Sequence, residues 1–493
     1  MAKKHKNRKI DAAKVENRYD AAGTGRRMAG WNTPSSGPNY AIGNPQKIRD
    51  RARDVVRNDW AGTSSVRVWA NNIIGTGIIP RPTTKNATLK EKLTELWNAW
   101  VRVADADGVL DLYGLQQLVL RTWFTGGEAF IRLRPRRMAD GLPVPLQIQV
   151  LEADMVPQLD VDNYPGLPSG NIIRSGIELN KIGQRTAYWM WKNHPGDKQP
   201  STIIYNEVVR IPAEGVLHIY EPNRPGQLRG VSEMASVIAK LRNVADYDDA
   251  QLLRQNLANM FTLFITKQLP TGAADVMTGL PYAGSLDEPL AGLEPGIAQE
   301  LLPGEDVKFS DPPDAGANYA DFMRVQHLGV AAGSGAPYEL ISGDIKDVSD
   351  RTLRIVINEF RRCCEQKQWL IFIPKMCQPI RDAWAVAAEL SGALTAAEAV
   401  EAGKVRWAPQ GWAYIHPVQD VQAKAAEVEA GFRSRSSVIT ERGDDPDAVD
   451  LERADDLKRA DALGLIPTAP VDPNADKAAS DKKKQQAKPK KKP

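Results

Sequence analysis

The chain has 493 residues, of which 42% are apolar and 25% charged, so it is long enough for several folded domains and ordinary in composition. Its three cysteines (Cys363, Cys364 and Cys377) form no spaced framework, which argues against a secreted disulfide fold and for a reducing cytosol. No apolar run approaches the ~20 residues that a bilayer-spanning helix needs, and no apolar segment follows the basic N-terminus as a signal peptide would require.

The net charge of +3 is divided unevenly along the chain. Residues 1–9 carry +5 and residues 477–493 carry +7, which leaves about −9 for everything between them. A folded surface that grips DNA should be basic, because phosphate contacts dominate the affinity for DNA. An acidic folded part is instead consistent with a protein that lets a duplex slide past, although many soluble proteins are mildly acidic.

The N-terminal part of the chain is expected to be an arm followed by helices. Residues 1–44 are basic and then rich in Gly, Ser, Asn and Pro, which predicts disorder. Apolar residues at helical spacing predict helices at 45–74, 89–103 and 113–124, and glycines follow the first and third as stop signals. Four tryptophans on these apolar stripes are interpreted as core or subunit-contact residues: Trp60, Trp69, Trp97 and Trp100.

Strands follow these helices. Residues 128–134 and 146–150 alternate with period two, and 216–220 is a further expected strand. Residues 172–179 and 186–191 are predicted to form a hairpin across 180–183. Because helices and strands are segregated along the chain, we predict an α+β domain and not a doubly wound sheet.

The central stretch is predicted to contain three helices. The first runs from Ser232, a plausible N-cap, to about Met260 and would span roughly 45 Å. A Gly- and Pro-rich insertion at 262–317 separates it from a helix at 318–333. The polar loop 342–349 then leads into a helix at 351–387, which Pro374 and Pro379 should kink or end.

The C-terminal part is expected to be helical and then disordered. Residues 391–465 are rich in Ala and Glu, with a helix through 423–432, Ser437 as the N-cap of a short helix, and a last helix at 447–463. Residues 466–493 are rich in Pro, Ala and Lys, which predicts disorder.

Enzyme signatures were sought without success. There is no G-x-x-x-x-G-K-[ST], H-E-x-x-H or G-x-S-x-G, and the five histidines have no metal-ligand spacing. Asp105, Asp107 and Asp111 could be imagined as a nuclease metal cluster, but their place beside Gly108 between two helices favours a turn with solvated carboxylates. We therefore predict a protein that is not an enzyme, with no catalytic residue, no cofactor and no metal.

Four stretches of the sequence are distinctive: residues 217–230 (LHIYEPNRPGQLRG), 301–309 (LLPGEDVKF), 336–344 (APYELISGD), and Trp407-Ala408-Pro409 leading to Trp412 and His416-Pro417. In these stretches the chain resembles the portal proteins of tailed bacteriophages, of the lambda type. The family usually has Asp before that last proline, where this chain has His416. The resemblance covers roughly residues 47–465, which excludes only the two termini.

The resemblance implies a portal fold with a mixed α/β wing, a long helical stem, a small α/β clip and a helical crown, assembled as a cyclic ring. The implied parts are a disordered basic arm (1–44), the wing (45–230), a stem helix (231–261), the clip (262–317), a stem helix with the tunnel loop (318–350), a kinked wing helix (351–390), the crown (391–465) and a disordered Lys-rich tail (466–493).

The resemblance also implies site residues in the stem and its loop. The tunnel loop would face the DNA, and its Lys346 would contact passing phosphates unless the loop is merely solvated; the loop residues are Asp344, Lys346, Asp347 and Ser349. Three acids on the first stem helix could line the channel, lie between subunits or form a plain exposed face: Asp246, Asp248 and Asp249.

Two further groups carry open alternatives. Small residues on the second stem helix would let subunits approach closely, or would pack within their own subunit: Gly329, Ala332 and Gly333. Tail lysines could bind DNA, meet an acidic partner or only maintain solubility: Lys482, Lys483, Lys484 and Lys490. Neutralising seven phosphates would give a salt slope of roughly −6.

The function implied is a portal, or head-tail connector, at one capsid vertex of the virion, assembled in the host cytoplasm. A dodecameric ring would pass double-stranded DNA without sequence specificity during packaging and ejection. Expected partners are the terminase large subunit, which would hydrolyse ATP, major capsid and scaffold proteins, and neck or tail proteins, but no membrane. The alternatives are a DNA-binding scaffold or minor capsid protein without a channel, and a nuclease that uses the carboxylate cluster.

Overall fold

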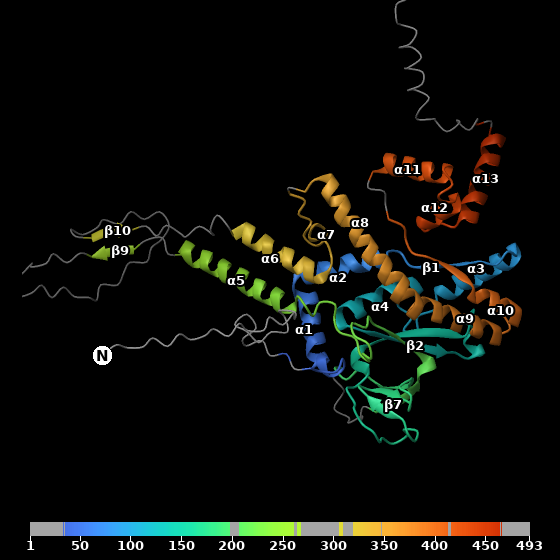
Figure 1. Ribbon diagram of the computed structural model, residues 1–493, viewed down its shortest axis with the longest axis horizontal. Coiled ribbons are helices and arrows are strands. Elements are labelled where there is room, and N and C mark those ends of the chain that lie inside the picture. The colour runs from blue at the N-terminus through green and yellow to red at the C-terminus, as the bar shows by residue number, and fades with distance from the viewer. Residues whose placement is uncertain are drawn as a thin grey trace, which may run out of the picture.

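The computed structural model describes residues 33, 35–197, 207–260, 264–267, 305–308, 319–346, 348–412, 416–463 and 465. These residues form a body of helices and small sheets, from which the helix pair α5 (Ile238–Met260) and α6 (Tyr319–Ser334) projects (Figure 1). A unit of three C-terminal helices stands off another part of the body: α11 (Pro417–Glu429), α12 (Arg435–Glu441) and α13 (Pro446–Ala462).

The first helical stretch is two helices and not the single one predicted. After the short η3 (Tyr40–Ile42), α1 (Pro45–Asn58) ends at Asp59 and α2 (Trp60–Ile73) begins there, because the Asp59 carboxylate accepts from the backbone N–H groups of Ala61 and Gly62. A side chain at Gly62 would lie 2.7 Å from Val55, so the absent Cβ lets the two helices pack closely. The predicted helices after them are present as α3 (Ala87–Val101) and α4 (Leu112–Gly126).

The strands form small sheets in which every pair of named strands is antiparallel. One sheet has the order β3-β2-β8, from β2 (Ala129–Pro135), β3 (Leu146–Glu152) and β8 (Val216–Ile219). The other has the order β4-β5-β6-β7, from β4 (Ile172–Arg174), β5 (Ile177–Leu179), β6 (Arg185–Trp191) and β7 (Val208–Pro212). Short helices η4 (Met138–Asp140), η5 (Ala153–Met155) and η6 (Ala213–Gly215) lie between strands. The predicted α+β class is confirmed.

Residues 172–179 form two strands and not one. The chain turns between β4 and β5 at Ser175 and Gly176, which both have positive φ (49° and 76°). The predicted hairpin across 180–183 is present between β5 and β6.

The projecting pair begins later than the sequence predicted. Residues 233–237 form turns, and α5 starts at Ile238, so Ser232 is not its N-cap. The Ser232 hydroxyl instead donates to the carbonyl of Phe124 and accepts from the N–H of Met234. Strands β9 (Phe264–Lys267) and β10 (Glu305–Lys308) pair with each other, and the short α7 (Tyr338–Ser342) follows α6.

The two prolines do not end the long helical stretch that follows, but its α-helical pattern changes to a π-helix around Pro374. It runs through α8 (Asp350–Lys367), the π-helix η7 (Gln368–Cys377) and α9 (Gln378–Leu390). Pro374 lies inside η7, and Pro379 is the second residue of α9, which continues directly from η7. The side chains of η7 that face the core include Ile371 and Phe372, which are buried.

The C-terminal segment is not wholly helical as predicted. After α10 (Ala396–Gly403), β11 (Val405–Ala408) pairs with β1 (Ile79–Pro82) and ties this segment to the N-terminal part of the chain. Ser437 is not a cap: the cap of α12 is Ser434, whose hydroxyl accepts from the N–H of Ser437. The last helix is present as α13, close to its predicted bounds.

The main core lies among α2, α3, α4, η7 and α9 and is rich in aromatic side chains. Trp97, Trp100 and Trp384 form a cluster of ring contacts, with Trp97 and Trp384 5.2 Å apart. Trp69 is buried as predicted, but Trp60 is 53% exposed and makes an edge-to-face contact with His327. The three cysteines are free thiols. Among the described residues, no helix is long and apolar enough to cross a membrane.

Candidate functional site

The projecting helix pair holds two of the predicted small residues against its own partner helix. A Cβ on Gly333 would lie 2.4 Å from Val237, and one on Gly329 would lie 2.3 Å from the Lys240 ammonium. The Ser236 hydroxyl also donates to the carbonyl of Gly333 (2.9 Å). Packing within the subunit therefore accounts for Gly333, whereas the contact at Gly329 is with the flexible end of a lysine side chain, and a role between subunits stays untested.

An adjacent flank of α6, about a quarter turn from these glycines, is apolar and exposed. Val325, Leu328 and Ala332 recur at i, i+3 and i+7, and Val325 is 60% exposed. On α5, Leu252 and Leu253 are also exposed. A pair of helices that presents apolar side chains on its outer flanks is typical of a surface that another chain covers.

The three acids predicted on the first stem helix lie in three different settings. Asp246 is exposed and forms an ion pair with Arg242 one turn away (3.0 Å). Asp248 accepts a hydrogen bond from the Tyr319 hydroxyl of α6, and this bond raises the pKa of Tyr319 to about 12. Asp249 is exposed. Asp248 therefore ties α5 to α6, and the group does not form one acidic site.

The predicted tunnel loop is a short, internally bonded turn between α7 and α8. The Asp344 carboxylate accepts hydrogen bonds from the backbone N–H of Lys346 (3.0 Å) and from the Tyr338 hydroxyl (3.2 Å), and it forms an ion pair with the Arg324 guanidinium (3.5 Å). The hydrogen bond from Lys346, followed by these two contacts, lowers the pKa of Asp344. Asp344 therefore orders the turn, and the exposed tip carries Ile345 and Lys346.

Ser349, the last predicted loop residue, is the N-cap of α8, since its hydroxyl accepts from the N–H of Thr352 (3.2 Å). The capping role fixes where the loop ends. Two other predicted sites lie outside the described residues: Asp347 of the loop and the tail lysines Lys482, Lys483, Lys484 and Lys490.

The stretch 217–230 is held by a buried ionic network that sequence reasoning missed. Glu128, fully buried just before β2, accepts hydrogen bonds from Arg229 (2.7 Å), from the N–H of Gly230 (2.8 Å) and from His218 (2.9 Å). The other ring nitrogen of His218 lies 2.9 Å from the Arg185 guanidinium. A Cβ on Gly230 would lie 2.0 Å from the carbonyl oxygen of Gly127. The backbone next to Glu128 and the backbone next to Arg229 are therefore in direct contact.

The network's protonation follows from this geometry. Burial alone would raise the pKa of Glu128, but Arg229 and His218 outweigh burial and hold that pKa well below its usual range. Burial lowers the pKa of His218 to about 4, so its ring is neutral at pH 7. A neutral ring donates to Glu128 through Nε2 and accepts from Arg185 through Nδ1.

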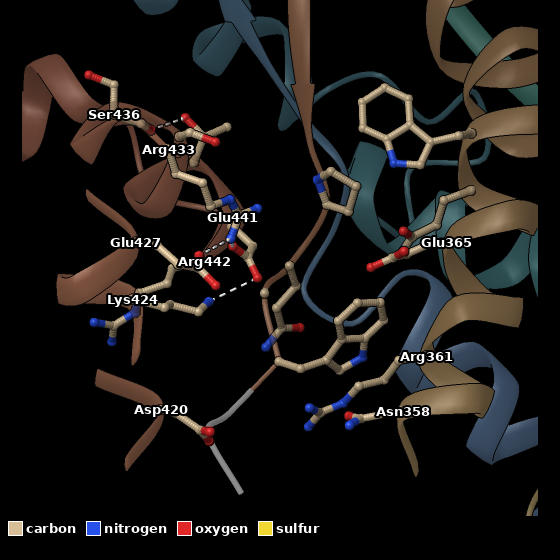
Figure 2. Close-up of a pocket in the computed structure, with 18 of the residues that line it drawn as sticks. Asn358, Arg361, Glu365, Asp420, Lys424, Glu427, Arg433, Ser436, Glu441 and Arg442 are labelled. Atoms are coloured by element: carbon tan, nitrogen blue, oxygen red, sulfur yellow. Dashed lines mark hydrogen bonds and ion pairs between the residues drawn. The ribbon is translucent and has the colours of Figure 1, made fainter. Parts of the chain in front are cut away.

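A groove of about 880 Å³ separates α8 from the C-terminal unit (Figure 2). Arg361 and Asn358 of α8 line one side, and Asp420, Lys424 and Glu427 of α11 line the other. Lys424 bridges to Glu441 of α12 (2.8 Å). The facing helices are therefore separated by a charged, solvent-accessible space and not by an apolar core.

The connection across this groove is polar. His416 bonds to Asp350 at the start of α8 (2.7 Å), and Trp412 lies under the Arg361 guanidinium. His416 precedes α11 without capping it by its side chain. Its link to α8 is the structural consequence of a His at the position where Asp is expected.

The rival metal clusters do not form as the sequence allowed. Asp105 is buried and not solvated as predicted, and its two oxygens accept from the N–H groups of Asp107, Val109 and Leu110. Asp111 caps α4. These carboxylates therefore shape a turn.

The fold does bring His194 to Glu152 and Asp154, with ligand atoms within 4.8 Å of one another. The Arg53 guanidinium contacts both carboxylates, at 2.8 and 2.5 Å. Arg53 already supplies the positive charge that a metal ion would bring, so this group is best described as an ion-pair cluster.

Comparison with known proteins agrees with the sequence resemblance. A family model described as phage portal protein, lambda family, matches residues 24–368. This chain belongs to the lambda family of phage portal proteins. The match contains the stretches 217–230, 301–309 and 336–344, whereas the fourth stretch lies beyond it.

Curated relatives extend the likeness over most of the chain. The chain is 25% identical over 443 residues to the probable portal protein of Halomonas phage phiHAP-1, covering 85% of this chain and 82% of that protein. It is 23% identical over 526 residues to portal protein B of Escherichia phage lambda, covering 91% and 90%. Among solved structures, a chain from the neck of a native GTA particle computed with C12 symmetry covers 86% of this chain at 15% identity and a TM-score of 0.45.

Proposed function

We propose that this portal-family chain assembles head to tail into a closed ring, expected to be a dodecamer, that forms the channel for double-stranded DNA at one capsid vertex. The observation that carries the proposal is the projecting α5–α6 pair, whose outer flanks expose Val325, Leu328, Leu252 and Leu253. A head-to-tail ring needs two different flanks on each subunit that cover each other. In such a ring, α6 of one copy would pack beside α5 of the next.

The tunnel loop supports the channel role. It lies beside the projecting pair, because the Arg324 guanidinium of α6 donates to the carbonyl of Lys346 (3.1 Å). Its exposed tip offers one cation, Lys346, which suits a transient contact with a phosphate more than a tight grip. The acidic balance of the chain between its basic ends is consistent with a duplex that slides.

The partners follow from the family and from position along the chain. Residues 262–317, of which only β9 and β10 are described, would form the clip that docks the terminase large subunit during packaging and neck or tail proteins later. Capsid and scaffold proteins would surround the wing. ATP hydrolysis would belong to the terminase, because the sequence contains no phosphate-cradling G-x-x-x-x-G-K-[ST] motif.

Negative-stain microscopy with mass by light scattering tests the ring. We expect rings with a central hole and roughly twelve-fold symmetry for the purified chain, and their loss in Val325→Asp/Leu328→Asp. Asp321→Asn, an exposed change on the same helix, is the control. A wild-type chain that stays monomeric or dimeric at high concentration, also with its scaffold partner added, would favour the alternative of a scaffold or minor capsid protein without a channel.

A packaging assay tests the channel separately. In rings of normal mass, Lys346→Ala should slow DNA packaging or reduce DNA retention while terminase binding stays unchanged. If Lys346→Ala has no effect on DNA packaging, ejection or retention, the tunnel loop has no role in the channel.

A further inference from the structure

The C-terminal unit lacks a core of its own. None of the described residues of α11, α12 and α13 is buried. Its ties to the body are polar, such as the ion pairs of Lys90 with Asp445 (3.3 Å) and Asp447 (2.6 Å). A module of three short helices without buried apolar area is not stable alone, because nothing offsets the entropy of ordering it.

Helix α11 presents its polar face inward and its apolar face outward. Asp420, Lys424 and Glu427, at i, i+4 and i+7, line the groove toward α8 (Figure 2). Val418 and Val421 lie on another flank and are 70% and 51% exposed. A helix that packs only within its own chain has the reverse arrangement, so the apolar flank of α11 is expected to meet another surface.

A complementary surface is present on α8. Arg351, Ile355 and Arg362 are exposed at i, i+4 and i+11, and the half-exposed Trp369 of η7 follows seven residues later, at the edge of the groove that faces the chain's own C-terminal unit. Ile355 and Trp369 are large apolar side chains with nearly half or more of their surface in solvent. Trp and Arg together are the side chains most enriched in the energetic centres of protein interfaces.

The charges of the two surfaces are opposite. Residues 417–463 contain twelve acidic and seven basic side chains, whereas α8 contains five basic and three acidic ones. Two copies of the C-terminal unit would repel each other, so unit-to-unit pairing is disfavoured. On the exposed face of α8, Arg351 lies one turn from Ile355, and Arg362 pairs with Glu359 (3.0 Å). A contact between the acidic unit of one copy and this helix of another, whose net charge is +2, is attractive, and it joins two different patches, as a head-to-tail ring requires.

We propose that Val418 and Val421 of α11 in one copy dock on the exposed face of α8 around Ile355 and Trp369 in the adjacent copy. This interface would be a second contact between subunits of the proposed ring, and the inference rests on that proposed function. It completes the fold of the C-terminal unit, which is then ordered only after subunits assemble.

Disulfide trapping tests the contact in the full-length chain. Ile355→Cys/Val421→Cys should form, on mild oxidation of assembled rings, a ladder of covalent multimers on a non-reducing gel. Ile355→Cys/Gln422→Cys places the second thiol about 100° away on the same helix and should give no ladder. Each single-cysteine variant controls for the half-buried native Cys363.

Hydrogen exchange gives a readout that needs no substitution. Amides of α11–α13 should exchange at least tenfold more slowly in rings than in monomers, and Val421→Asp should abolish that protection while the ring persists through α5 and α6. Rings that form without a ladder and without protection of α11–α13 would overturn this interface and leave the proposed function standing. Failure to form rings at all would instead count against the proposed function.

Discussion

Replacing Arg229 by Met should lower the free energy of unfolding more than any surface substitution of similar size. Arg229 is 2% exposed and donates to Glu128 and to three carbonyl oxygens, of Ala153 (3.0 Å), Val156 (3.2 Å) and Ser175 (2.8 Å). The substitution removes the cation and leaves the Glu128 carboxylate buried without its charge partner. Loss of one member of a buried ion pair costs roughly 3–5 kcal/mol, and the three carbonyls place the expectation at the upper end.

Urea unfolding followed by tryptophan fluorescence measures this loss, because Trp123 and Trp384 are buried in the main core. Arg174→Met is the matched control: it breaks the exposed ion pair with Asp162 and should cost about 1 kcal/mol or less. The double variant Glu128→Gln/Arg229→Met should lose less than the two single losses combined, by about 2 kcal/mol, because no carboxylate is left unpaired. A single-variant loss equal to that of the control, or strictly additive losses, would refute a buried charge pair at this position.

The remaining predictions concern His218 and the small residues of α6. Because burial lowers the folded pKa of His218 to about 4 from an unfolded value of about 6.5, the unfolded chain binds the proton first, and stability should fall by about 2 kcal/mol between pH 7 and pH 5. His218→Gln should remove that part of the pH dependence of the urea midpoint; an unchanged slope would show that His218 is not its source. Gly333→Val should destabilise the monomer by about 1–3 kcal/mol through its clash with Val237, whereas Ala332→Val, one residue away and exposed, should leave monomer stability unchanged and weaken ring assembly. Equal effects of the two changes on the monomer would contradict the packing described.

The sequence predicted element types well where one local signal dominated. The tryptophan-bearing apolar stripes of α3 and α4 and the turn at residues 180–183 are examples. Errors arose where two local signals competed. Apolar spacing runs on across 45–74, but the Asp59 carboxylate caps a new helix there, and the π-helix η7 accommodates Pro374 where a proline normally ends a helix.

Long-range partners could not be predicted from the chain. Glu128 lies about a hundred residues from Arg229 in the sequence. Apart from the preceding glycine, no residue near Glu128 in the sequence indicates that its side chain is buried. The same holds for β1 and β11, which pair across more than three hundred residues. Such contacts depend on chain reversal in three dimensions, whereas caps and periodicity act within a few residues.

Small residues on α6 illustrate a further limit of sequence patterns. The run from Gly329 to Gly333 indicates that something approaches this helix closely, and the sequence left open whether that is the same subunit or its neighbour. In the structure, Gly333 faces Val237 in the turn before α5 and Gly329 faces Lys240 of α5, whereas Val325, Leu328 and Ala332 on another flank remain uncovered. Helix α6 therefore has two adjacent faces with different partners: a glycine face that packs within the subunit and an apolar face that is exposed. The two faces can be told apart only once the position of α5 is known. The flank that α5 leaves open is the one on which an assembled neighbour has to act, and the contrast between Gly333→Val and Ala332→Val measures the two separately.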